Sequence, residues 1–339
     1  MKRLTERARR ASLDVVTGPG GGILVFLVLL CAVAAFSVPN FWDGDNWYDL
    51  ANLTVFIAIL AIGMTVVLIS GGIDLSVGAT VGLTGGVVAS LMGGGTSMPI
   101  AFLAAIAVGT GIGLINGLLI TKLRISDFIA TFAMLGVVRG ILYVWTEGIP
   151  FADFINEPYY KIGGLQRLVW QITVPMIVTV VVAVAVAGML RFTALGRHIY
   201  GVGSNRDAAR LSGVNVDRVR ISVYMLSGFL AAITGILLAG RNTTVQPQMG
   251  ETYEFSAIAA AVMGGAALSG GRGRVRGAVL GAFTLIVIQN IIFLADVSPT
   301  WERVVTGLII LFAVLADRLS GVVVPRVRRL LKGGVPAQP

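Results

Sequence analysis

The stretch Ser70–Ala79, which reads SGGIDLSVGA, places a single carboxylate between two long apolar segments. From Asn52 to Met92 the only charged residue is Asp74, and this length suffices for two membrane-crossing helices of about 20 residues each. A charged side chain at the centre of a membrane helix costs about 2.5 to 3.5 kcal/mol, so Asp74 is a functional candidate. Alternatively, Asp74 lies in a polar turn and caps the helix that starts near Leu75.

The composition is that of a multi-pass membrane protein. The 339 residues are 56% hydrophobic and 13% charged, and their mean hydropathy is +0.87. The 44 glycines fit this class, because small residues let membrane helices approach closely. A single cysteine, Cys31, excludes an internal disulfide, and a single histidine, His198, argues against a zinc site. We therefore expect no metal in this chain.

Ten apolar segments are predicted to be transmembrane helices. The first follows a basic start and imitates a secretory signal, but its apolar run continues past the candidate cleavage site, so we expect an uncleaved helix. The predicted spans are Gly22–Val38, Leu50–Ile69, Leu75–Met92, Met98–Ile120, Phe128–Trp145, Val174–Leu190, Ile221–Ala239, Ser256–Ser269, Gly277–Ala295 and Val304–Ala316.

The basic residues follow the positive-inside rule. When loops are assigned alternately to the two sides, 21 of the 26 Lys and Arg residues fall on one side and four on the other. The net charge of +9 therefore reflects membrane orientation and not nucleic-acid binding. We predict a cytoplasmic basic N-terminus (1–21), a transmembrane domain (22–320) and a cytoplasmic basic tail (321–339).

The two halves of the chain contain similar segments. Asp74-Leu75-Ser76 precedes a glycine- and alanine-rich span, as does Glu254-Phe255-Ser256. The loop charges make the first copy enter the membrane from the inside and the second from the outside, as an inverted repeat requires. Short spans at matching positions of two halves indicate a transport site near the membrane centre.

The loop 191–220 is the only long polar segment on the predicted cytoplasmic side. It contains a short helix signature, in which Asn205 is the cap, Asp207 lies in the first turn and Gly213 ends the helix. Such a helix is marginal alone in water, so it either docks against a partner or is a solvated connector. Its candidate residues are Asn205, Asp207, Ala208, Ala209, Arg210, Leu211 and Gly213.

Three motifs, in order, resemble the ribose-type permeases of bacterial ATP-binding-cassette (ABC) importers. They are Gly71–Gly78, the coupling-loop run Ala194–Asn205 with its continuation to Val214, and the run from Gln246-Pro247 through Glu254 and Met263-Gly264-Gly265 to Gly271. With Arg139-Gly140, the resemblance extends over about residues 22 to 320.

The resemblance implies a transport subunit without enzymatic activity in the bacterial inner membrane. In such importers two permease chains, identical or different, form the pathway, and a periplasmic or lipid-anchored binding protein delivers a monosaccharide or similar polyol. Two separate subunits bind ATP and magnesium, so no cofactor is expected here. Asn205–Leu211 would be the coupling helix that contacts them. The chain departs from the family at Ser256, where an aspartate is usual, and at Asp127, where a proline is common.

The chain lacks the Gly-x-x-x-x-Gly-Lys-Ser/Thr loop that binds ATP phosphates. Its energy must therefore come from a partner or from an ion gradient. In the second case Asp74 and Glu254 would be ion-coupling carboxylates of a secondary transporter. A membrane enzyme is disfavoured, because no clustered His, Cys or Ser constellation is present.

Candidates for lining or gating the pathway are polar or aromatic residues inside the predicted spans. Each neutral one can instead form a helix-to-helix hydrogen bond, and Arg139 can pair with Glu147 or snorkel. For Asp74 we favour a structural role, capping or gating the third helix beside the pathway. The candidates are Asn52, Thr54, Asp74, Ser76, Asn116, Thr131, Phe132, Arg139, Glu254, Ser256, Gln289 and Asn290.

Overall fold

A computed structural model describes residues 21–163, 166–167, 172–298, 300–301, 303–312 and 315. The basic segment 1–20 and the tail 321–339, both predicted to be cytoplasmic, lie outside the described residues. The described part is helical, apart from an isolated antiparallel bridge between Phe151 and Val245. An all-α chain is what the apolar spans predict.

The helices coincide closely with the predicted spans. Six are long and apolar enough to cross a membrane, namely α3 (Gly44–Ile69), α5 (Met98–Thr121), α6 (Asp127–Thr146), α8 (Val174–Phe192), α11 (Val216–Asn242) and α13 (Val275–Leu294). Shorter apolar helices occupy the other predicted spans, namely α2 (Gly21–Ser37), α4 (Val77–Gly93), α12 (Tyr253–Met263) and Arg303–Phe312. The remaining short helices are α7 (Glu157–Ile162), α9 (Ala194–Ser204) and α10 (Arg206–Leu211).

Several helix boundaries differ from the prediction by a few residues, and two of them have clear local reasons. Helix α12 ends at Met263 and not at Ser269, because the chain turns through Gly265, whose φ of +89° favours glycine. Helix α11 begins at Val216, before its apolar run, because the Asn215 side chain accepts a backbone N–H bond and caps it. Apolar content located these helices, and turn and cap chemistry set their ends.

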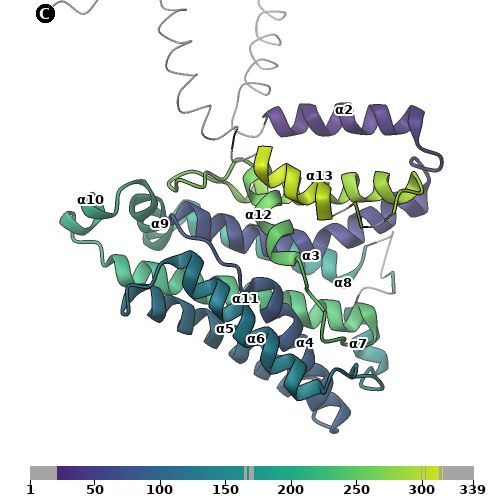
Figure 1. The fold of residues 1–339 in the computed structure, drawn as a ribbon, viewed down its shortest axis with the longest axis horizontal. Helices are drawn as coiled ribbons and strands as arrows, with labels where there is room; N and C mark the ends of the chain where they lie inside the picture. The colour runs from purple at the N-terminus through teal and green to yellow at the C-terminus, as the bar shows by residue number, and fades with distance from the viewer. Residues whose placement is uncertain are drawn as a thin grey trace, which may run out of the picture.

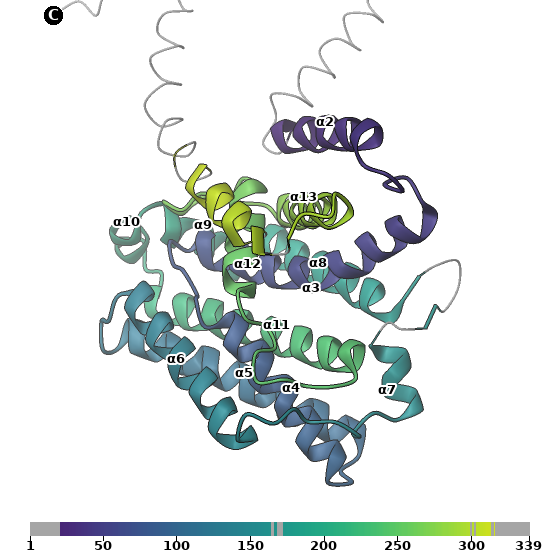
Figure 2. The same ribbon diagram turned by 45° about the vertical axis from the view of Figure 1, so that its right-hand side comes forward.

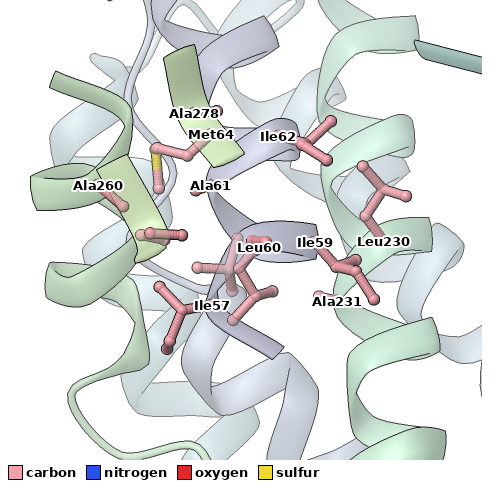
Figure 3. Packing of buried hydrophobic residues seen from close by; sticks show 14 of the residues in the cluster. Ile57, Ile59, Leu60, Ala61, Ile62, Met64, Leu230, Ala231, Ala260 and Ala278 are labelled. Carbon is pink, nitrogen blue, oxygen red and sulfur yellow. The ribbon is translucent and has the colours of Figure 1, made fainter. Parts of the chain in front are cut away.

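Helix α3 lies at the centre of the fold. Its most apolar window is 94% buried within the chain, against 28% for α5, α6 and α8. Figure 3 shows its residues between Leu230 and Ala231 of α11 on one side and Ala260 of α12 and Ala278 of α13 on the other. The helix is therefore surrounded by protein, and α5, α6 and α8 have far more exposed apolar surface.

Glycines allow α5 and α11 to pack backbone against backbone. A Cβ atom on Gly113 of α5 would collide with the Tyr224 carbonyl of α11, and one on Gly228 would collide with the Gly109 carbonyl. Close approach at small residues is the usual way in which membrane helices associate. This contact places Asn116 of α5 and Ser227 of α11 on facing helices.

The short helices α4 and α12 begin at the same place. Gly78 lies in the first turn of α4. A Cβ atom at this position would collide with the carboxylate of Glu254, which lies at the start of α12. From this point the two helices run apart, as Figures 1 and 2 show. We call this contact, formed by Ser76–Gly78 and Tyr253–Glu254, the half-helix junction. Figure 1 also shows α10 at one end of the helices and α7 at the other.

Candidate functional site

Asp74 lies in the non-helical segment between α3 and α4 and is 1% exposed. Its Oδ1 accepts hydrogen bonds from the backbone N–H of Ser76 at 3.0 Å and from the Ser76 hydroxyl at 2.7 Å. Its Oδ2 accepts a bond from the Ser227 hydroxyl of α11 at 2.7 Å. The carboxylate therefore fixes the start of α4 and ties it to α11.

Asn116 of α5 extends this network. Its Nδ2 donates to the Ser76 hydroxyl at 2.8 Å, while its Oδ1 is buried without a partner among the described residues. Asp74, Ser76, Asn116 and Ser227 are each at most 2% exposed. Buried polar groups are stabilised by such bonds, so the network holds three helices in register.

Glu254 contributes the second carboxylate near the start of α4. It is 5% exposed, and its Oε2 has no hydrogen-bond partner among the described residues. Ser256 is equally buried. It occupies the position where the ribose-type permeases usually have an aspartate, so this site has one carboxylate and not two. The half-helix junction thus combines one unpaired carboxylate oxygen with the N-terminal end of α4, which favours negative charge.

Arg139 of α6 holds the loop that precedes α12. Its Nη1 donates to the carbonyls of Pro247 at 2.9 Å and Met249 at 2.7 Å. Its charge also interacts with Glu254 and Glu251. The expected interaction with an acidic neighbour thus involves Glu254 and Glu251, while Nη1 binds backbone carbonyls of the loop between α11 and α12.

The other sequence candidates lie outside this network, although Thr131 reaches the carbonyl of Ile73, the residue before Asp74. Asn52 accepts a bond from Thr173 at 2.9 Å and donates to the Tyr48 carbonyl at 3.1 Å. Phe132 is 59% exposed on α6. The rest are placed as follows: Thr54 bonds the Leu50 carbonyl, Thr131 the carbonyls of Asp127 and Ile73, Asn290 pairs with Asn46, and Gln289 is partly buried.

We expect Asp74→Asn to keep near-normal stability and uptake, because its side chain can still accept from Ser76 and can donate to the Ser227 hydroxyl. Asp74→Ala removes the acceptor of the Ser76 N–H and of the Ser76 and Ser227 hydroxyls in a buried site, so the free energy of unfolding is expected to fall by about 1.5 to 3 kcal/mol. Thermal unfolding of the purified protein, with uptake measured in parallel, tests this. An assembled but inactive Asp74→Asn transporter would contradict a structural role.

The predicted cytoplasmic helix is present as α10. The Asn205 side chain accepts the backbone N–H of Ala208 at 2.9 Å, as predicted, and Gly213 follows with φ of +82°. Ala209 is buried against the protein, while Leu211 is 90% exposed. Asp207, Ala208 and Arg210 are exposed as well. Helix α10 therefore offers a small surface with an unpartnered leucine.

Helix α10 is also bonded to the Asp74 segment. Arg206, its first residue, donates to the Gly71 carbonyl at 2.8 Å. Close by, the Gly271 backbone N–H donates to the Ile69 carbonyl at 2.9 Å, and a Cβ atom on Gly203 would collide with that same carbonyl. The loop that carries α10 thus contacts the segment that carries Asp74 directly.

Comparison with known proteins identifies the family. The family described as a permease component of branched-chain amino acid transport systems matches residues 46–314. The chain belongs to this permease family. The match includes the Ser70–Ala79 stretch, the loop with α10 and the half-helix junction.

Named relatives of this permease include import proteins from several bacteria. It is 40% identical to the ribose import permease protein RbsC of Escherichia coli (strain K12) over 296 residues, 87% of this chain and 92% of the relative. RbsC of Bacillus subtilis (strain 168) is 37% identical over 317 residues, 94% and 98% of the two chains. The autoinducer 2 import system permease protein LsrC of Salmonella typhimurium is 34% identical over 301 residues, 85% and 84%. The resemblance inferred from the three motifs is confirmed.

The sequence candidates for this permease omitted one buried charge cluster near α10. Asp127, the first residue of α6, pairs with Arg220 of α11 and accepts the Tyr224 hydroxyl at 2.8 Å. The Tyr224 hydroxyl also lies 3.2 Å from the Ile73 carbonyl, next to Asp74. In the sequence Asp127 stood out only as a departure from the family, and the preceding residue Ser126 caps α6. The sequence signal that could have revealed this cluster is Asp127 itself, an acidic residue at a position where the family commonly has a proline.

Proposed function

We propose that this permease is the membrane subunit of an ABC importer and forms the pathway for a monosaccharide or a similar polyol. The observation that carries the proposal is the likeness to ribose import permeases over nearly their whole length. The relative named for autoinducer 2 import supports a broader class of small polar solutes.

The proposed arrangement is a ten-span protein of the bacterial inner membrane with both termini in the cytoplasm. The six long helices and the four shorter apolar ones support ten spans. The excess of Lys and Arg in the loops near α10 supports a cytoplasmic position for that end. Because α4 and α12 begin at one junction and run apart, the geometry also favours an inverted repeat.

The proposed partners divide the work of transport. ATP-binding subunits, which carry ATP and magnesium, contact α10 and supply energy. A substrate-binding protein docks on the opposite side, and a second permease chain, identical or different, completes the pathway. The exposed surface around Leu211, joined to Gly71 through Arg206, supports α10 as the element that carries ATPase motion to the Asp74 segment. In this scheme Asp74 and Glu254 organise the half-helix junction.

Reconstitution tests the proposal. The permease is placed in liposomes with candidate ATP-binding and substrate-binding proteins from the same organism, and radiolabelled D-ribose, D-xylose and D-glucose are offered. We expect uptake of at least one sugar only when ATP, both partners and magnesium are present. Uptake by the permease alone on a proton or sodium gradient would instead support the ion-coupled alternative, with Asp74 and Glu254 as coupling groups.

A further inference from the structure

A polar cavity of about 330 Å³ opens beside the loop between α11 and α12. This volume is within the range of small-ligand pockets. Four of its five lining side chains are neutral hydrogen-bonding groups, and none carries a charge. The lining residues are Asn242, Thr244, Gln246, Gln248 and Met249.

The wall of this cavity is held in a defined conformation. Val245 exchanges two backbone hydrogen bonds of 3.0 Å with Phe151, and Arg139 binds the carbonyls of Pro247 and Met249. Burial alternates along the segment: Val245, Pro247 and Met249 are buried, while the two residues between them are exposed. Gln246 and Gln248 therefore face away from the protein interior together.

The depth of this loop indicates what its exposed face contacts. Arg139 lies about 10 Å along the α6 axis from the end of that helix at Thr146. Its guanidinium holds the loop between α11 and α12 against this apolar helix. Gln248 and Glu251 are exposed on the same loop, and polar side chains at this depth are stable only against protein or water. We therefore expect this face to meet water or a partner chain and not lipid.

We propose that Asn242, Thr244, Gln246 and Gln248 form a hydroxyl-binding subsite for a neutral monosaccharide in the outer half of the pathway. Each amide offers donors and an acceptor, and the threonine offers a hydroxyl, which together match the donor and acceptor character of sugar hydroxyls. The uncharged lining suits a neutral solute. This subsite rests on the proposed transport function and gives it a point of substrate contact.

Cysteine labelling of the complete transporter tests the subsite. Cys31 is the only native cysteine, so Cys31→Ser gives a thiol-free background in which Gln246→Cys and Gln248→Cys are made separately. We expect a water-soluble, membrane-impermeant thiol reagent to label both variants from outside. D-ribose, D-xylose or D-glucose is expected to slow labelling at least threefold. The control is Val184→Cys, which is 67% exposed on apolar α8 and should stay unlabelled.

The proposal is overturned if neither thiol reacts, or if labelling is equally fast with every sugar. Labelling requires no ATP, so it is read separately from transport. If the wild-type complex imports no sugar but a sugar still protects Gln248→Cys, the transport function fails and the subsite stands. As a second measurement, Gln248→Leu is expected to reduce initial uptake about tenfold and Gln248→Asn less, with normal complex assembly.

Discussion

Ala208→Glu is expected to abolish binding of the ATPase subunits, and with it uptake, while the permease stays folded in the membrane. Ala208 is exposed on α10, whereas its neighbour Ala209 is buried and anchors the helix. A glutamate at position 208 places a charged, bulky group where a partner must pack against Leu211, and burying an unpaired charge is costly. Co-purification of the complex, followed by uptake in liposomes, measures both effects.

The matched control is Ala194→Glu. Ala194 is exposed in the same loop but begins α9, and a glutamate in the first turn of a helix is favourable. This variant should assemble and transport normally. Survival of complex formation and uptake in Ala208→Glu would show that α10 is not the coupling element.

Asp127→Ala is expected to lower the free energy of unfolding by about 3 to 5 kcal/mol, because it leaves the Arg220 guanidinium buried without its carboxylate. The two side chains are only 8% (Arg220) and 18% (Asp127) exposed, and Tyr224 also loses its acceptor. Thermal or denaturant unfolding of the purified permease measures the change.

Two comparisons test whether the loss of stability comes from leaving a charge buried and unpaired or only from removing a charged side chain. Lys122 and Asp217 also form a salt bridge, at 3.0 Å, but are 58% and 38% exposed, so Lys122→Ala should cost less than about 1 kcal/mol. The double variant Asp127→Ala/Arg220→Met removes both buried charges and should recover much of the loss. Equal destabilisation by Lys122→Ala and Asp127→Ala would contradict the role of burial.

The apolar spans could be predicted because composition and length determine where helices form in a membrane. The Asn205 cap gave the start of α10 correctly, whereas the start of α11 at the Asn215 cap and the end of α12 before the Gly265 turn were missed. The importance of the Asp74 stretch was visible in the sequence because an isolated carboxylate among apolar residues is conspicuous. Its partner Ser227 was not, because one serine in an apolar helix resembles any other.

Long-range pairings account for most of what the sequence could not reveal. Arg139 carried a recognisable charge, but only the folded loop shows that it binds the carbonyls of Pro247 and Met249. Likewise, Gln246 was evident as part of a family motif, whereas its exposure beside a cavity depends on the Phe151 bridge far away in sequence. Periodicity describes a residue's place on its own helix and gives no information on which distant segment meets it.

The contact between Gly78 and Glu254 restricts how the two halves of the chain can diverge. A Cβ atom at position 78 would meet the backbone carbonyl of Gly250 as well as the Glu254 carboxylate, so a shorter side chain at position 254 would not by itself make room for it. Across a set of homologues, position 78 should therefore stay glycine even where the long acidic side chain at position 254 is replaced.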